Sequence, residues 1–244
     1  MATPGRAPPT PSLGRITNGY TIEEGRFLTQ SGAHTVIPHL YCALDFMTRF
    51  LRGKGVSYAV MGGLAMILRG SRRETHDVDI VAACDMLTLR QACIGQSRIK
   101  VPIGPGSGVM RVFVEVGPTH GENVTHQWVQ VDIILRGSLG APADLTGTTD
   151  IINLPTQAGL KRYIVIDILH HFQSKLGALF GRNSTTDFLD LVFMCNTYFQ
   201  QIAGFRNQLS FPQREHFIRH YAAGIRDPSQ LNRVKKIKQL LGVP

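Results

Sequence analysis

The stretch that decides the fold is VMGGLAMILRGSRRETHDVDIV, residues 60–81. Its apolar start reads as the end of a buried strand, and Gly62 and Gly63 lie where that strand turns into a short helix. Glycine lets backbone N–H groups approach a ligand closely, and a helix N-terminus adds partial positive charge. The pair can therefore cradle phosphate, although most glycine pairs at strand ends are simply turns.

The same stretch ends in two acids, Asp77 and Asp79, which are two residues apart on a predicted strand over 77–82. Side chains alternate along a strand, so both carboxylates point to one face, while Val78 and Ile80 point to the other. Two like charges this close repel unless a cation lies between them, and carboxylate oxygens suit magnesium. The alternative is two solvent-facing acids on a half-exposed strand, which the apolar flanks disfavour.

A third acid, Asp132, lies inside the apolar segment QWVQVDIIL, residues 127–135. Alternation places Val131 and Ile133 on one face and Asp132 on the other. An acid within so apolar a strand is costly to bury unless it is paired or bound to a metal. The sequence thus predicts a metal ligand here, with an ion pair to a core arginine as the alternative.

Together these features resemble the nucleotidyltransferase superfamily that includes DNA polymerase beta. The hallmark of that superfamily is a hydrophobic residue followed by Gly-Gly or Gly-Ser, a spacer, Asp-x-Asp, and a lone Asp on a later strand. Here thirteen residues separate Gly63 from Asp77. The resemblance covers roughly residues 40–136. It implies an α+β fold: a small mixed β-sheet nucleotidyltransferase core with flanking helices, followed by a C-terminal helical bundle.

A second motif is similar to the helices of minimal and abortive-infection-type nucleotidyltransferases. It comprises HFQSKLGA (residues 171–178), then Arg182, then DFLDL (residues 187–191). In those relatives the lysine, here Lys175, helps to hold the triphosphate. The first acid, Asp187, follows Thr185-Thr186 where relatives more often have Lys-Asp. That departure leaves Asp187 open to a structural role in a helix cap with Ser184.

The resemblance implies a magnesium-dependent transfer of a nucleoside monophosphate from a nucleoside triphosphate such as ATP, with release of pyrophosphate. Asp77, Asp79 and Asp132 would hold two magnesium ions and carry the catalysis, with Asp132 as the expected general base. The acceptor would be a hydroxyl or phosphate on a small molecule, tRNA or protein. The residues expected to bind the nucleotide are Gly62, Gly63, Ser71, Lys175, Arg182 and Asp190. Two alternatives stay open: a catalytically silent nucleotide-binding regulator, and a toxin-like RNA-modifying enzyme.

The pattern along the chain predicts four regions. Residues 1–35 form a flexible N-terminal arm, 36–140 the nucleotidyltransferase core, 141–155 a Gly-, Pro- and Thr-rich linker, and 156–244 a helical domain. Further strands are expected over 56–61 and 109–116, and residues 95–108 are expected to form a loop or flap. In the second half, helical patterns cover 164–180, 185–203, 212–224 and 229–241.

The composition is that of a basic globular protein with a formal net charge of +9, which favours polyanionic partners. The sequence has no run of about 18 apolar residues, so it predicts no membrane span. Residues 1–26 lack the apolar block of a secretory signal. We therefore expect a cytoplasmic protein whose four cysteines are reduced. Basic residues of the last helix, with Arg233 and Lys236 among them, offer a site for RNA contact, although such a pattern usually marks a solvated helix face.

Overall fold

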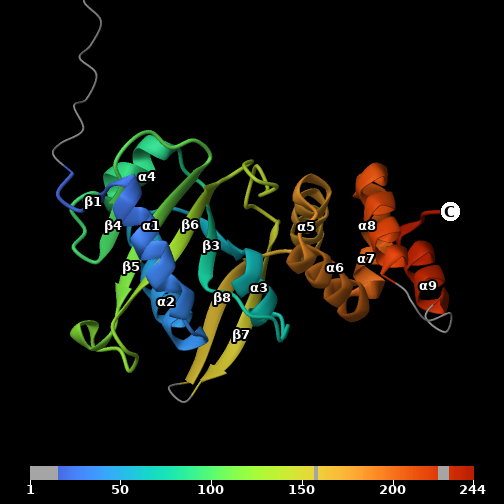
Figure 1. Cartoon of the computed structure of the whole chain (residues 1–244), viewed down its shortest axis with the longest axis horizontal. Coiled ribbons are helices and arrows are strands. Elements are labelled where there is room, and N and C mark those ends of the chain that lie inside the picture. Colours follow the sequence, from blue (N-terminus) through green and yellow to red (C-terminus); the bar gives the residue numbers. More distant parts are fainter. Residues whose placement is uncertain (1–15, 157–158, 225–230) are drawn as a thin grey trace, which may run out of the picture.

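The computed structural model describes residues 16–156, 159–224 and 231–244. Its centre is one mixed sheet of eight strands in the described residues, with helices α5 to α9 gathered at one end of it (Figure 1). From one edge to the other, the strands are β1 (Gly19–Tyr20), β4 (Ile99–Pro102), β5 (Val109–Val116), β6 (Gln127–Leu135), β3 (Asp77–Ala82), β2 (Tyr58–Met61), β8 (Gly159–Ile166) and β7 (Thr149–Thr156).

The middle of the sheet fixes the positions of the acids. Strands β3 and β6 are parallel neighbours, and β2 runs antiparallel to β3 on its other side. The apolar side chains of β3 and β6, such as Val78, Ile80, Val131 and Ile133, are fully buried against helix α2 (Ile37–Gly53). The opposite face is left for Asp77, Asp79 and Asp132, as strand alternation predicts.

The helical half has its own core. Helices α5 (Ile168–Arg182), α6 (Thr185–Thr197), α7 (Phe199–Phe205), α8 (Phe211–Ala223) and α9 (Leu231–Leu241) bury a cluster centred on Phe172 and Phe217. Met66, from helix α3 (Gly62–Leu68), is fully buried in that same cluster. Helix α3 therefore connects the glycine turn to the helical half.

The predicted linker and the predicted start of the helical region need correction. The predicted linker, 141–155, contains most of strand β7, and the region from 156 onward opens with strand β8 rather than a helix. Helix α5 consequently begins at Ile168, not at residue 164. The two strands pair in a hairpin at the sheet edge, where β7 is half exposed, and its Thr, Asn and Pro residues read as a linker. The last residues of β8, 164–166, are apolar and also fit the start of the helical pattern predicted over 164–180.

The other two corrections concern the loop and the arm. The predicted loop 95–108 contains β4, a four-residue strand paired with β5. The predicted arm 1–35 contains β1, helix α1 (Ile22–Ser31) and a 3₁₀ turn over Gly32–His34; residues 1–15 lie outside the described residues. Helix α1 begins with a capping box in which the Thr21 hydroxyl and the Glu24 carboxylate each bond the other's backbone N–H. Tyr20 and Leu28 pack on Phe113 of β5, so this segment belongs to the core.

Candidate active site

The three predicted acids lie together. Asp79 and Asp132 are directly opposite each other in the parallel register of β3 and β6, and Asp77 is two residues before Asp79 on the same face. One oxygen from each carboxylate lies within 4.8 Å of the oxygens of the other two. Sequence alternation and strand pairing are together sufficient to produce this cluster.

The cluster carries unbalanced negative charge. Burial, followed by the charges of Asp77 and Asp132, raises the pKa of Asp79 from 3.8 to about 7, although Lys175 and the Gly63 N–H act in the opposite direction. A divalent cation among the three oxygens would remove this repulsion. Three hard oxygen donors at this separation fit magnesium, which also takes phosphate oxygens as ligands.

The glycine pair is required by close contacts. Gly62 has a φ of +64°, and a Cβ built on it would lie 1.8 Å from Oδ2 of Asp79. A Cβ on Gly63 would lie 2.4 Å from Oγ1 of Thr75. That Thr75 hydroxyl is buried and donates a 2.9 Å hydrogen bond to Asp77. The turn thus packs directly against two of the acids, and only glycine fits at either position.

Asp132 has an arginine partner that the sequence analysis did not identify. Nε and Nη2 of Arg111, on the neighbouring strand β5, each donate a 2.8 Å hydrogen bond to a different oxygen of Asp132. The two residues are opposite each other in the antiparallel register of β5 and β6. The alternative predicted for Asp132 was an ion pair with a core arginine. Arg111 forms the ion pair, but its side chain is half exposed and so it is not a core residue. Alternation of Arg111 with buried Val112 and Met110 was the available signal.

A cleft of about 540 Å³ lies between the acids and the helical half. Of the predicted site residues, Gly62, Asp79, Lys175 and Arg182 line it. Its far wall is formed by Gly177, Ala178 and Gly181 of α5 together with Gln213 of α8. Because small residues face the cleft from α5, the helix backbone approaches it closely and leaves room for a flat group.

A buried ion-pair network lies beside the cleft. Nζ of Lys175 is 3.0 Å from Asp187 and 2.7 Å from Asp190, and both carboxylates are almost fully buried. Arg182 pairs with Asp187 at 2.7 Å, and Arg73 pairs with Asp190 at 2.6 Å. Burial works to raise the pKa of Asp187, but Lys175 and Arg182 outweigh it and hold that pKa below its usual value. Ser184 caps α6, since its hydroxyl accepts the N–H of Asp187.

Three of the predicted nucleotide-binding residues, Gly63, Ser71 and Asp190, lie outside the residues that line the cleft. Asp190 is fully engaged by Lys175 and Arg73. The Ser71 hydroxyl accepts the N–H of Arg73 at 3.4 Å and closes the turn after α3. Arg73 was missed by sequence reasoning, yet it joins the glycine turn to α6: its guanidinium lies 3.1 Å from where a Cβ of Gly63 would be. No pattern distinguishes Arg73 from Arg72 in the sequence.

His171 is a second residue without a sequence signal. It is fully buried in α5, and burial, followed by the charges of Lys175 and Arg69, holds its pKa well below 6.5. Neither ring nitrogen has a hydrogen-bond partner of good geometry in the described residues, although the Gly62 main chain lies beside the ring. The imidazole is therefore neutral and packs beside the main chain of the glycine turn.

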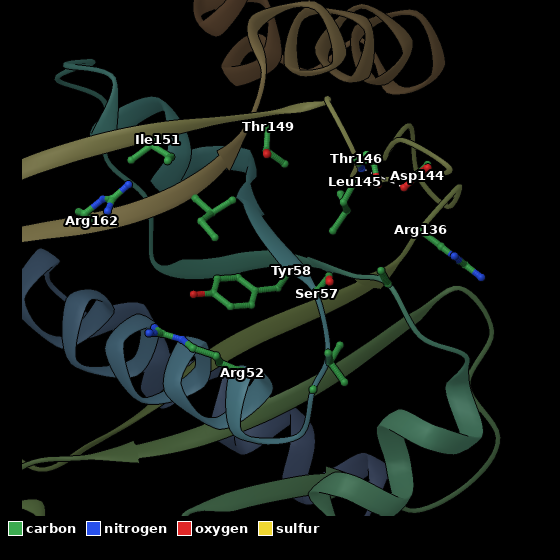
Figure 2. A pocket seen from close by; sticks show the side chains of 14 residues that line it. Arg52, Ser57, Tyr58, Arg136, Asp144, Leu145, Thr146, Thr149, Ile151 and Arg162 are labelled. Atoms are coloured by element: carbon green, nitrogen blue, oxygen red, sulfur yellow. Dashed lines mark hydrogen bonds between the residues drawn. The ribbon is translucent and has the colours of Figure 1, made fainter.

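A larger cavity lies elsewhere in the described residues. It measures about 890 Å³ and is lined by the beginnings of β2 and β7, by Arg162 and Ile164 of β8, and by residues that follow β3 and β6 (Figure 2). The acids occupy the opposite end of β3, and only one acid, Asp144, lines this cavity. The candidate site is therefore the smaller cleft, which Asp79 lines, and not the larger cavity.

Comparison with solved structures agrees with this arrangement. The chain is similar to an antigenic nucleotidyltransferase-like protein from Paracoccidioides brasiliensis, with a TM-score of 0.54 and 18% identity over 83% of this chain and 94% of that one. A match to the lincomycin-bound lincosamide antibiotic adenylyltransferase LnuA has a TM-score of 0.37 and 15% identity over 61% of this chain and 91% of that one, which is too weak to support an argument. No protein-family model and no curated protein matches the sequence.

The chain therefore shares the fold of that nucleotidyltransferase-like protein, in agreement with the resemblance noted in the sequence. Both the mixed sheet and the helices that follow it agree with the expected α+β class. In the described residues, no helix is both long and apolar enough to cross a bilayer.

Proposed function

We propose that this protein is a magnesium-dependent nucleotidyltransferase that moves a nucleoside monophosphate from a nucleoside triphosphate to a hydroxyl or phosphate acceptor. The observation that carries the proposal is the cluster of three carboxylates within 4.8 Å, packed against a glycine turn at the mouth of a cleft. Repelling acids are costly to hold together, so a purely structural role gives no reason for them.

The transfer itself balances simply. An oxygen of the acceptor attacks the α-phosphorus, the new P–O bond forms, and the bond from the α-phosphorus to the bridging oxygen breaks, so that pyrophosphate leaves. Asp132 is the proposed proton acceptor for the attacking hydroxyl, and Arg111 holds that carboxylate in place through two hydrogen bonds. Magnesium, held by Asp77, Asp79 and Asp132, would offset charge on the triphosphate and on the leaving group.

The cleft would accommodate the nucleotide. Gly62 lines the cleft, and its missing side chain would let the backbone approach the phosphates closely. Arg182 is the more available cation, because its side chain is 67% exposed, whereas Lys175 is buried between two aspartates. The nucleobase would lie against the small residues of α5, near Gln213.

The test is transfer of label. The full chain is incubated with magnesium, a cell extract and each of the four nucleoside triphosphates labelled at the α-phosphate, and the labelled product is identified. We expect label to appear with the wild type and to be absent with Asp79→Asn. Label transfer that is equal for the wild type and the variant, or the absence of any labelled product with all four triphosphates, would contradict the proposal.

Nucleotide binding is tested separately with Arg182→Gln. Loss of one charge-assisted contact should weaken magnesium-nucleotide affinity by about tenfold in calorimetry. Arg219→Gln is the matched control, because Arg219 is equally exposed, at 70%, and lies on α8, where it pairs only with Glu215. Equal affinity for the two variants would remove Arg182 from the nucleotide site.

A further inference from the structure

The 890 Å³ cavity has a charge composition that the proposed transfer does not use. Three arginines line it, Arg52, Arg136 and Arg162, against the single acid Asp144. In the part of the chain that the structure describes, none of the three arginine side chains forms an ion pair or a hydrogen bond. Asp144 is occupied locally, since its carboxylate accepts the N–H of Thr146 at 2.9 Å. The cavity is thus a concave surface with a net positive charge.

The cationic groups come from separate elements and surround one opening. Arg52 belongs to the end of α2, Arg162 to β8, and Arg136 follows β6. Figure 2 shows the Tyr58 hydroxyl pointing to the side of the cavity on which Arg52 and Arg162 lie, while Arg136 extends away on the other side. The Tyr58 hydroxyl makes no hydrogen bond to any described residue, so it is available as a third donor beside the two guanidinium groups.

Between these groups the walls are apolar. Ile164, Leu145 and the edge of Tyr58 line the cavity, and Ile151 of β7 is 54% exposed there. A combination of guanidinium groups with exposed apolar and aromatic surface suits a chain of nucleotides, whose phosphates pair with arginine and whose bases need a flat apolar contact. An acidic peptide would use the arginines but would leave the apolar walls uncovered.

The position of the cavity relates it to the acids. Asp79 and Ala83 are four residues apart on one sheet face, as are Asp132 and Arg136, so each pair is separated by about 13 Å along parallel strands at about 3.3 Å per residue. The segment containing Ala141 and Leu145 packs on the face between them. The cavity therefore lies beyond the strand ends that follow the acids and reaches both faces of the sheet, because Arg52 and Tyr58 belong to the α2 side, whereas Leu145 packs on the side of the acids.

We propose that this cavity, lined by Arg52, Arg162 and Tyr58, binds single-stranded nucleic acid. The site differs from the basic surface of α9, which the sequence suggested for RNA contact, because α9 lines none of the described cavities. The inference does not depend on catalysis, so binding can be measured on the intact chain whether or not it transfers nucleotides.

The experiment uses fluorescein-labelled 12-nucleotide oligouridine and anisotropy at low salt in EDTA, with oligothymidine of the same length as the DNA arm. The test variant is Arg52→Gln/Arg162→Gln. The matched control is Arg233→Gln/Lys236→Gln, which removes two exposed charges from α9. We expect the test variant to bind about tenfold more weakly, with the slope of log affinity against log salt reduced by roughly 1.4, and the control to bind as the wild type does.

A second variant, Tyr58→Phe, removes only the hydroxyl and should weaken binding about threefold, as loss of one modest hydrogen bond predicts. Binding of both RNA and DNA supports the proposal, and their ratio tells which sugar is preferred. It is overturned if neither oligonucleotide binds the wild type, or if the two double variants weaken binding equally. It is also overturned if oligoglutamate of the same charge binds as tightly with the same dependence on Arg52 and Arg162.

Discussion

Two groups of aspartates each contribute one residue, Asp79 or Asp187, to the lining of the same cleft, and the groups differ in how their charge is balanced. In the network of α5 and α6, Asp187 and Asp190 are buried but surrounded by Lys175, Arg73 and Arg182, and the pKa of Asp187 falls below its usual value. On the sheet, burial and two neighbouring acids raise the pKa of Asp79 to about 7. The difference teaches that balanced acids contribute to the fold, whereas unbalanced acids cost stability and indicate a site prepared for a cation.

The largest expected effect that separates the two groups is on transfer activity. Asp79→Asn and Asp132→Asn should each lower the transfer rate by about a thousandfold, because several kcal/mol of charge stabilisation at the phosphates depend on the acid cluster. Rates are measured with labelled nucleoside triphosphate and the identified acceptor. Glu215→Gln, an exposed acid of α8, is the control and should keep full activity. Near-normal activity in either Asn variant would place the chemistry elsewhere.

The next largest effect is on stability and belongs to the balanced group. Asp190→Asn should lower the free energy of unfolding by about 3 kcal/mol, because it leaves buried Lys175 and Arg73 with too little negative charge. Urea denaturation of the variant and of Glu215→Gln measures it. A loss below about 1 kcal/mol would mean that the network is solvated and does not join the two halves.

For the sheet acids the expected change in stability has the opposite sign. The folded-state pKa of Asp79 is raised from 3.8 to about 7, so the unfolded state ionises first and the wild type loses stability as the pH rises through this window. Asp79→Asn removes the ionisation and should raise the melting temperature by a few degrees at pH 8 in EDTA, but by much less at pH 5. Thermal melts at the two pH values provide the measurement, and an equal shift at both would exclude charge repulsion as the cause.

The smallest expected effect concerns the contact between the acids and the turn. Thr75→Val keeps the shape but removes the hydroxyl that donates to Asp77, which should cost about 1 kcal/mol of stability in urea denaturation. Thr75→Ser keeps the donor and should lose less than half as much. If both variants behave alike, methyl packing rather than the hydrogen bond sets the position of Asp77.

The central part of the fold follows from the sequence because its determinants are local. Alternation along 77–82 and 127–135 gives both strands their residue ranges and the face of each acid. The β7–β8 hairpin was missed since an edge strand with one exposed face carries weak alternation, and Pro155 and Asn153 are typical of loops. Helix α1 was missed because its apolar contacts, such as Leu28 on Phe113, are made to a strand about 85 residues later in the chain.

The site was predicted unevenly for the same reason. Carboxylates spaced two apart carry their geometry within the sequence, whereas the arginines that hold them come from other elements. Arg111 reaches Asp132 through strand pairing, and Arg73 reaches Asp190 across 117 residues of chain. Neither pairing can be deduced without the tertiary structure. Lys175 was expected near phosphate, and it also pairs closely with Asp187 and Asp190.

Helix α3 contacts both halves of the protein. Its first residues form the glycine turn beside Asp79, and Met66, one turn later, is embedded in the core of the helical half. Arg69 at its end donates to the carbonyl of Ile166, and Tyr198 of the helical half lies against it. We therefore expect a ligand that orders the turn to stabilise the helical half as well, and the reverse, because both contact this one helix. Ligand binding at the glycine turn and the packing of the helical half thus depend on the same short helix.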